Sequence, residues 1–148
     1  MNALTICQPY AELIICGEKR VENRTWTTGY KGPLLIHAGK SRQWLDSYKP
    51  LPAHMDYGVV IGVVQLRGCI RFRRRIPLHA VILEAWPWLD GHPHCMGPYC
   101  WILEDAFRFP HPVPFPGRQR LFDVPSGLVA TGLSQAMEAR AARAAMEG

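Results

Sequence analysis

Lys19, Glu22 and Arg24 form a compact group of charged residues near the start of the chain. In an extended segment Glu22 and Arg24 would share one face with Arg20 and Trp26. A carboxylate between two cations stays ionised and fixed in place, because nearby opposite charges favour its charged form. Such a group could hold a base edge or a ribose through charge-assisted hydrogen bonds, or could orient a water molecule as a nucleophile. The alternative is an ion network that only holds a helix to a sheet.

Aromatic side chains occur in the same region and in a later strand candidate. A nucleic-acid base stacked on an aromatic ring gains about 1–3 kcal/mol, whereas Tyr and Trp in strands commonly pack in a core. Tyr10 precedes the charged group, and Tyr99 and Trp101 lie in the later strand. Trp26 is the preferred stacking residue, because it shares the predicted face with Glu22.

Several other basic residues are candidates for contacts with phosphates, namely Lys31, Lys40, Arg42 and the run Arg71–Arg75. Each phosphate that a cation neutralises releases counterions, so such binding weakens steeply with salt. A solvated, arginine-rich strand end is the alternative for the run. Gly39-Lys40-Ser41 lacks the longer glycine spacing of a nucleoside-triphosphate loop, and no such site is predicted.

A metal site is not predicted. His92, His94, Cys95 and Cys100 have side chains of the types that bind zinc, but their spacing matches no common structural zinc pattern. By strand alternation, Cys100 should also point away from its neighbours Tyr99 and Trp101. We therefore expect neither a metal nor another cofactor.

The composition is that of a globular protein with a modest excess of positive charge. The 148 residues include 17 basic and 12 acidic side chains, which give a formal charge of +5 and are compatible with a polyanionic partner. Five widely spread cysteines argue against a disulfide scaffold. The first ten residues do not resemble a secretory signal, and no apolar run approaches the roughly 20 residues that a bilayer requires. We expect a cytoplasmic protein without a membrane partner.

The order of apolar and turn residues predicts about six strands with a few helices. A strand over Ala3–Cys7 should be followed by a helix over residues 11–16 that ends at Gly17. Short helices are expected after Ser41 and around Val81–Ala85. Glycines in the longest strand candidate indicate bulges, as in a curved sheet, and strands of this kind favour a small barrel. The other extended segments are expected at Lys19–Trp26, Leu34–Ala38, Tyr57–Phe72, Tyr99–Glu104, Phe107–Phe115 and Arg120–Val124.

The end of the chain differs in composition from the rest. Residues Leu133–Glu147 are rich in alanine and lack proline and glycine, which favours a helix. Its apolar stripe is thin, so we expect it to pack lightly or to fray. This divides the chain into a domain of residues 1–130 and a C-terminal alanine-rich helix or tail of residues 131–148.

Three segments resemble the activating signal cointegrator homology (ASCH) domain family, a branch of the PUA-like superfamily. They are Leu4–Ala11, Gly17–Trp26 with its Gly-x-Lys-x-x-Glu-x-Arg spacing, and Tyr99–Asp105. With the Gly-Pro-Leu-Leu-Ile-His-Ala strand and Gly117-Arg118-Gln119, the resemblance covers most of residues 3–125. It implies an α+β fold, a PUA-like mixed and partly open β-barrel with flanking helices. It also implies a cleft between the first helix and the barrel, where the Lys-Glu-Arg motif lies.

The resemblance implies RNA or another nucleic acid as the partner, since the family is similar to RNA-binding modules. The cleft would recognise a nucleotide or a modified nucleoside. Taking the resemblance and the residues together, the predicted ligand-binding side chains are Lys19, Glu22, Arg24, Trp26, Tyr10, Lys40 and Arg42.

An enzymatic role stays open as the alternative. Some small bacterial members of the family hydrolyse the amide of N4-acetylcytidine, and some members have been described as metal-dependent ribonucleases. In a small hydrolase of this kind, Lys19 and Glu22 would be the catalytic residues. The amidohydrolases, however, carry a threonine where this chain has Glu22. A glutamate can act as a general base but not as a hydroxyl nucleophile.

Overall fold

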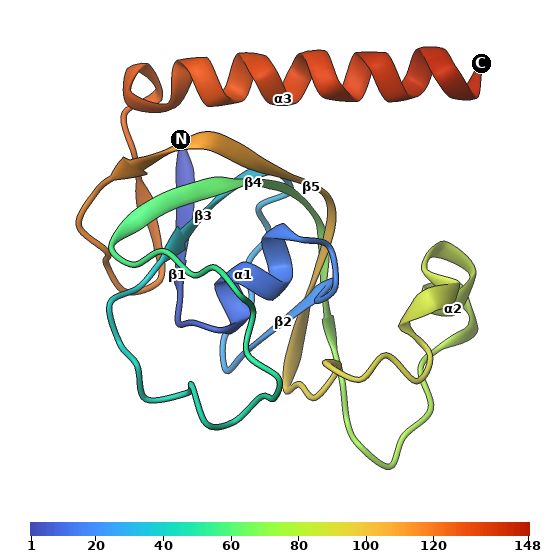
Figure 1. The fold of residues 1–148 in the computed structure, drawn as a ribbon. Helices are drawn as coiled ribbons and strands as arrows, with labels where there is room; N and C mark the ends of the chain where they lie inside the picture. Colours follow the sequence, from blue (N-terminus) through green and yellow to red (C-terminus); the bar gives the residue numbers. More distant parts are fainter.

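The computed structural model describes residues 1–148, which form a six-stranded mixed sheet curled into a half-barrel (Figure 1). The strand order is β2-β5-β4-β3-β1-β6, so β2 and β6 are the two edges. β1 and β3 are parallel and all other neighbours are antiparallel. The expected α+β class is therefore confirmed. The strands are β1 (Asn2–Ile6), β2 (Val21–Arg24), β3 (Gly32–Ala38), β4 (Val59–Arg71), β5 (Tyr99–Pro114) and β6 (Leu121–Asp123).

Helix α1 (Tyr10–Ile15) packs into the concave side of the sheet, where Ile14 and Ile15 join the largest buried cluster together with Trp101. Its buried Glu12 forms a bidentate ion pair with Arg108 of β5. Arg108 Nη1 donates to Glu12 Oε2 over 3.0 Å, and Arg108 Nη2 donates to Glu12 Oε1. Bidentate pairs of this type fix geometry as well as adding energy. The helix is thus held firmly against the strand that pairs with β2.

Gly62 lies at a bulge of β4 and allows α1, β4 and β5 to approach one another closely. The pairing of β4 with β5 shifts register between Val60 and Gly62. A Cβ atom at Gly62 would lie 2.2 Å from the carbonyl oxygen of Phe107 and 2.5 Å from Cδ1 of Ile15. The bulges expected from the glycines of this strand are therefore present, and this one has a steric cause.

Between β4 and β5 the chain makes an irregular excursion. It contains α2 (Ala80–Ala85) and a short 3-10 helix, η1 (Pro87–Leu89). Leu89, Cys100 and Ile102 form a separate buried cluster here, with Trp86 packed against it. The helical turn expected around Val81–Ala85 is confirmed.

Helix α3 (Ser126–Glu147) crosses the convex side of the half-barrel (Figure 1). Val129 and Leu133 pack on the cluster that contains Phe109, whereas residues 141–148 are all exposed. The helix begins at Ser126 rather than near Leu133, so the boundary expected after residue 130 falls inside it. Gly132 fits within the helix because its missing side chain makes room for the ring of Phe109, which would lie 2.6 Å from an added Cβ.

Two further details differ from the expected elements. The short helix expected after Ser41 is absent, and residues 43–50 form turns and bends instead. β5 runs without a break from Tyr99 to Pro114 and so joins two segments expected to be separate. No helix of the structure combines the length and the apolar character that crossing a membrane requires.

Candidate functional site

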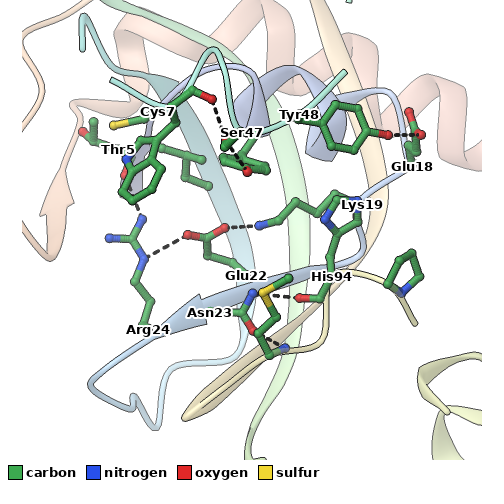
Figure 2. A pocket seen from close by; sticks show the side chains of 15 residues that line it. Thr5, Cys7, Glu18, Lys19, Glu22, Asn23, Arg24, Ser47, Tyr48 and His94 are labelled. Carbon is green, nitrogen blue, oxygen red and sulfur yellow. Dashed lines mark hydrogen bonds and ion pairs between the residues drawn. The ribbon is translucent and has the colours of Figure 1, made fainter. Parts of the chain in front are cut away.

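A cavity of about 680 Å³ opens between α1, β2, the turn segment 44–48 and the loop 93–96 (Figure 2). This volume lies within the range of small-molecule pockets. The residues that line it are Thr5, Ile6, Cys7, Tyr10, Glu18, Lys19, Glu22, Asn23, Arg24, Trp44, Ser47, Tyr48, Pro93, His94 and Met96.

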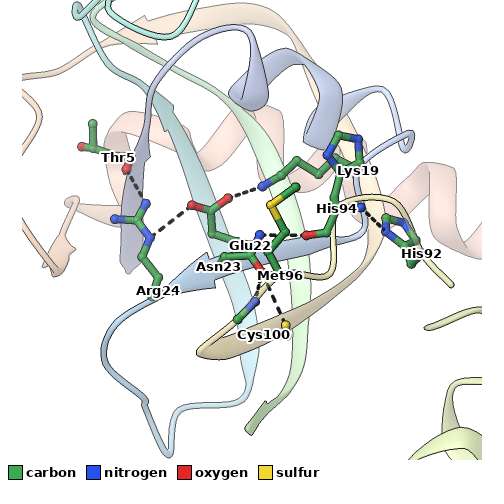
Figure 3. Close-up of polar contacts among 10 residues, drawn as sticks. Thr5, Lys19, Glu22, Asn23, Arg24, His92, His94, Met96 and Cys100 are labelled. Atoms are coloured by element: carbon green, nitrogen blue, oxygen red, sulfur yellow. Dashed lines mark hydrogen bonds and ion pairs between the residues drawn. The ribbon is translucent and has the colours of Figure 1, made fainter. Parts of the chain in front are cut away.

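The carboxylate of Glu22 lies between two cations in this cavity (Figures 2 and 3). Lys19 Nζ donates a hydrogen bond to Glu22 Oε2, and Arg24 Nε lies 3.2 Å from Glu22 Oε1. Lys19 is 4% exposed and Glu22 8% exposed. Ion pairs with this little solvent contact are screened much less by salt than surface pairs. The two cations and the acid therefore form a fixed polar floor.

The end of α1 sets the position of Lys19. Gly17 has a φ of +86°, a left-handed conformation that side chains disfavour. After this turn, the backbone N–H of Lys19 donates to the carbonyl of Leu13 over 2.9 Å. The lysine side chain then extends towards Tyr10, with Nζ 5.4 Å from the ring centroid. The glycine predicted to end the helix thus also directs Lys19 into the cavity.

Arg24 is tied to the first strand as well as to Glu22. Its Nη2 donates to the carbonyl oxygen of Thr5 over 2.9 Å (Figure 3). Its buried Nε makes no hydrogen bond, because its approach to Glu22 Oε1 is not aligned for one. The guanidinium is therefore anchored at one nitrogen and held by charge alone at another.

Three aromatic side chains, Tyr10, Trp44 and Tyr48, form walls of the cavity. The Tyr10 and Tyr48 rings meet edge to face at 6.5 Å. Tyr48 donates to Glu18 Oε1 over 2.7 Å, and this hydrogen bond raises the pKa of the Tyr48 hydroxyl. Trp44 is 48% exposed, so part of its side chain is accessible from solvent. The cavity therefore combines a charged floor with flat apolar surfaces.

Asn23 holds the loop 93–96, which forms another wall of the cavity, in place through hydrogen bonds. Its Nδ2 donates to the carbonyl of His94 over 2.7 Å, and its Oδ1 accepts from the backbone N–H of Met96 and Gly97 over 2.9 and 2.8 Å (Figure 3). Cys100 Sγ donates to the same Oδ1. β2 carries Glu22 and Asn23 on opposite faces. This one short strand therefore provides the Glu22 carboxylate of the floor and also the hydrogen bonds of Asn23 that position the loop 93–96.

The structure brings together only some of the predicted binding residues. Tyr10 joins Lys19, Glu22 and Arg24 in the cavity, whereas the other three lie outside it. Trp26 packs edge to face on Trp101 at 4.7 Å and is covered by the guanidinium of Arg120. Trp26 lies two residues beyond the end of β2, so strand alternation no longer decides which way its side chain points. The Lys40 side chain lies beside Gly58, and the Arg42 guanidinium lies 4.2 Å over the Tyr57 ring.

Several lining residues were not predicted from the sequence. Trp44 and Tyr48 lie in the turn segment, and His94 and Met96 lie in the irregular excursion. Neither segment has a hydrophobic period that would indicate where its side chains point. For Trp44, Tyr48 and His94 the only signal in the sequence is their aromatic or polar character, and for Met96 there is none.

The four residues considered as zinc ligands do not form a metal-binding group. Cys95 Sγ lies 3.3 Å from Cys100 Sγ, and the rings of His92 and His94 are 5.8 Å apart. The structure contains no cluster of three or more His, Cys, Asp or Glu side chains suited to hold a metal ion.

The pKa of His94 is lowered by burial and by the nearby Lys19 charge, and burial also lowers the pKa of His92 and of His37. Histidines in the unfolded chain have a pKa of about 6.5, so at a pH below this value the unfolded chain binds protons more readily than the folded chain. Stability should therefore be greatest above about pH 6.5 and should fall as the pH drops below it.

We expect the melting temperature to be lower at about pH 5.5 than at about pH 7.5, as measured by circular dichroism. Substitution of both His92 and His94 with glutamine should flatten this dependence. A melting temperature that is unchanged or higher at the acidic pH would contradict the expectation.

Comparison with known proteins identifies a family and a fold. The ASCH domain model matches residues 4–87. No curated protein matches the chain significantly. The crystal structure of the ASCH protein from Zymomonas mobilis is similar, with a TM-score of 0.51, 15% identity, and coverage of 90% of this chain and 93% of that chain.

Two single-substitution variants of the Zymomonas mobilis protein give TM-scores of 0.52 and 0.53 at 15% and 14% identity. Each alignment covers 90% of this chain, with 96% and 94% of the respective variant. At identities this low, the structural similarity shows a shared fold and nothing more.

Proposed function

This chain belongs to the ASCH domain family, and we propose that it binds RNA by taking one nucleotide, ordinary or modified, into the cavity beside α1. The observation that carries the proposal is the Glu22 carboxylate, which lies between Lys19 and Arg24 in a cavity walled by aromatic rings. We also interpret the half-barrel as PUA-like, with the cavity in the place of the family cleft.

The charged floor offers an acceptor next to a donor. Each carboxylate oxygen of Glu22 has one charged partner within 4.0 Å, and each can accept a further hydrogen bond. Lys19 donates one of its three N–H bonds to Glu22. A base edge with an amino group next to a ring nitrogen or carbonyl matches this pattern. The amino group would donate to Glu22, and its neighbour would accept from Lys19.

The walls supply surfaces for a base. Stacking on an aromatic ring contributes about 1–3 kcal/mol for each base. Trp44, with its accessible indole, is the foremost stacking residue, and Tyr10 and Tyr48 border the same space. A base enters such a cavity only when it is unpaired, so single-stranded RNA or a loop is the expected form.

Hydrolysis of a nucleoside amide or of RNA is the alternative, and no specific arrangement favours it. Both oxygens of Glu22 are ion-paired. Lys19 hydrogen bonds to Glu22 alone and not to a serine or threonine hydroxyl. No hydroxyl nucleophile is therefore activated by a hydrogen bond to Lys19.

Isothermal titration with the four ribonucleoside 5'-monophosphates tests the proposal. We expect saturable binding, weaker for uridine monophosphate because carbonyl groups flank its N–H donor and would face the carboxylate. The same samples should be incubated with N4-acetylcytidine. Turnover that Glu22→Gln abolishes would support the hydrolase instead. Absence of binding heat with every nucleotide up to about 1 mM would contradict nucleotide binding, because a dissociation constant of 1 mM corresponds to a binding free energy of only roughly −4 kcal/mol.

A further inference from the structure

The strand end of β4 and the turn after it carry arginines without acidic partners. Arg71, Arg73, Arg74 and Arg75 are all exposed, and none forms an ion pair. No Asp or Glu occurs between Leu66 and Leu83. These four side chains, called here the arginine segment, therefore present positive charge that the protein does not neutralise.

The sheet places the first of these arginines on the same side as the cavity. Tyr99 of β5 pairs with Arg24 of β2 on one side and with Arg71 of β4 on the other. Directly paired residues of antiparallel strands present their side chains on one face. Neighbouring strands lie about 4.8 Å apart, so the Cα atoms of Arg24 and Arg71 are separated by about 10 Å. The cation in the cavity and Arg71 thus belong to one row across the sheet, and the other three arginines follow directly after the end of β4.

A direct contact of Phe72, which lies between Arg71 and Arg73, also links this part of the chain to the cavity wall. The backbone N–H of Phe72 donates to the carbonyl of Pro98 over 2.9 Å. Gly97 lies so close to Phe72 that an added Cβ would be 2.7 Å from the Phe72 carbonyl oxygen. Met96, next to this contact, lines the cavity. Figure 1 shows the chain leaving β4 at the end of the sheet where β5 begins.

We propose that the arginine segment binds the phosphates that follow or precede the nucleotide in the cavity, so that the ligand is a single-stranded polynucleotide rather than a free nucleoside. The inference rests on the proposed function, because the cavity supplies the unpaired base and the arginines supply the backbone contacts. Arginine suits this role because its planar guanidinium binds phosphate oxygens in pairs. An RNA chain is favoured over other polyanions because the cavity near Arg71 has aromatic walls on which a base can stack.

The test compares an unstructured RNA oligonucleotide with a mononucleotide. Fluorescence anisotropy of the oligonucleotide, measured from about 50 to 200 mM salt, gives the slope of log K against log salt. For R73A/R74A/R75A we expect this slope to be shallower by about 2, since each lost phosphate contact in a single strand contributes about 0.7. Mononucleotide binding should stay within twofold of the unsubstituted protein.

R140A/R143A is the matched control, because both arginines are exposed on α3, lack ion pairs and lie in the last part of the chain. An unchanged slope in the triple variant, or an equal change in this control, would overturn the inference. Binding of anionic lipid vesicles without any binding of the oligonucleotide would overturn it in favour of a membrane surface.

Failure of the proposed function gives a different result. In that case oligonucleotide binding would be insensitive to Glu22→Gln and no mononucleotide would bind, while the triple variant would still report on the arginines alone.

Discussion

Substitution of Glu22 with glutamine should raise the dissociation constant for a mononucleotide by about 10- to 100-fold, which is the effect of losing a hydrogen bond to a charged group worth about 1.5–3 kcal/mol. Glutamine keeps the size of the side chain but replaces one acceptor oxygen by an amide donor. The amino group of the base would then face a second donor or a weaker acceptor. The change also leaves Lys19 and Arg24 without the acid that orients them. Isothermal titration measures this loss.

Glu104→Gln is the matched control for that variant. Glu104 also lies between two cations, with Arg20 at 3.4 Å and Arg67 at 3.2 Å, but it is outside the cavity. Its loss should leave the affinity unchanged. Should Glu22→Gln unfold the protein, Trp44→Ala provides a second variant, because this half-exposed indole is not part of the core. Unaltered affinity in a folded Glu22→Gln or Trp44→Ala protein would contradict base recognition by the cavity.

Substitution of Gly62 with alanine should destabilise the protein by about 3 kcal/mol, at the upper end of the usual cost of overpacking. The added methyl group would lie 2.2 Å from the backbone carbonyl of Phe107, which cannot move aside as a flexible side chain can. It would also push Ile15, and with it α1, away from the sheet. For a domain of this size the melting temperature should fall by about 10 °C, as scanning calorimetry would show.

Gly127→Ala tests whether this effect is steric. An added Cβ at Gly127 meets no atom within 4 Å, and the residue lies in the first turn of α3. Alanine favours helices over glycine, so the melting temperature should be equal or slightly higher. A similar loss of stability in both variants would show that the close packing at Gly62 has no special cost.

The regular elements and the charged motif were predictable because they follow local rules. The glycine at position 17 ends α1, and alternation along β2 puts Glu22 and Arg24 together. Alternation also predicted that Cys100 would point away from Tyr99 and Trp101. The structure places Cys100 in a different buried cluster from these two neighbours.

The walls of the site could not be predicted, because their positions depend on long-range contacts. Trp44 and Tyr48 come from a turn segment without a period, and their neighbourhood depends on contacts such as that between Tyr10 and Ser47. The position of Met96 depends on hydrogen bonds to Asn23, far away in the sequence. Conversely, Trp26 was assigned to the site by extending alternation past the end of its strand. Tertiary packing against Trp101 decides its orientation.

A crystal structure of the protein soaked with a ribonucleoside monophosphate would test the central claim most directly. The account predicts that the base lies beside Trp44, with its polar edge against Glu22 and Lys19 and its phosphate towards Arg24 and Arg71. A nucleotide bound elsewhere, or a base that avoids the Glu22 carboxylate while the cavity stays open, would contradict it.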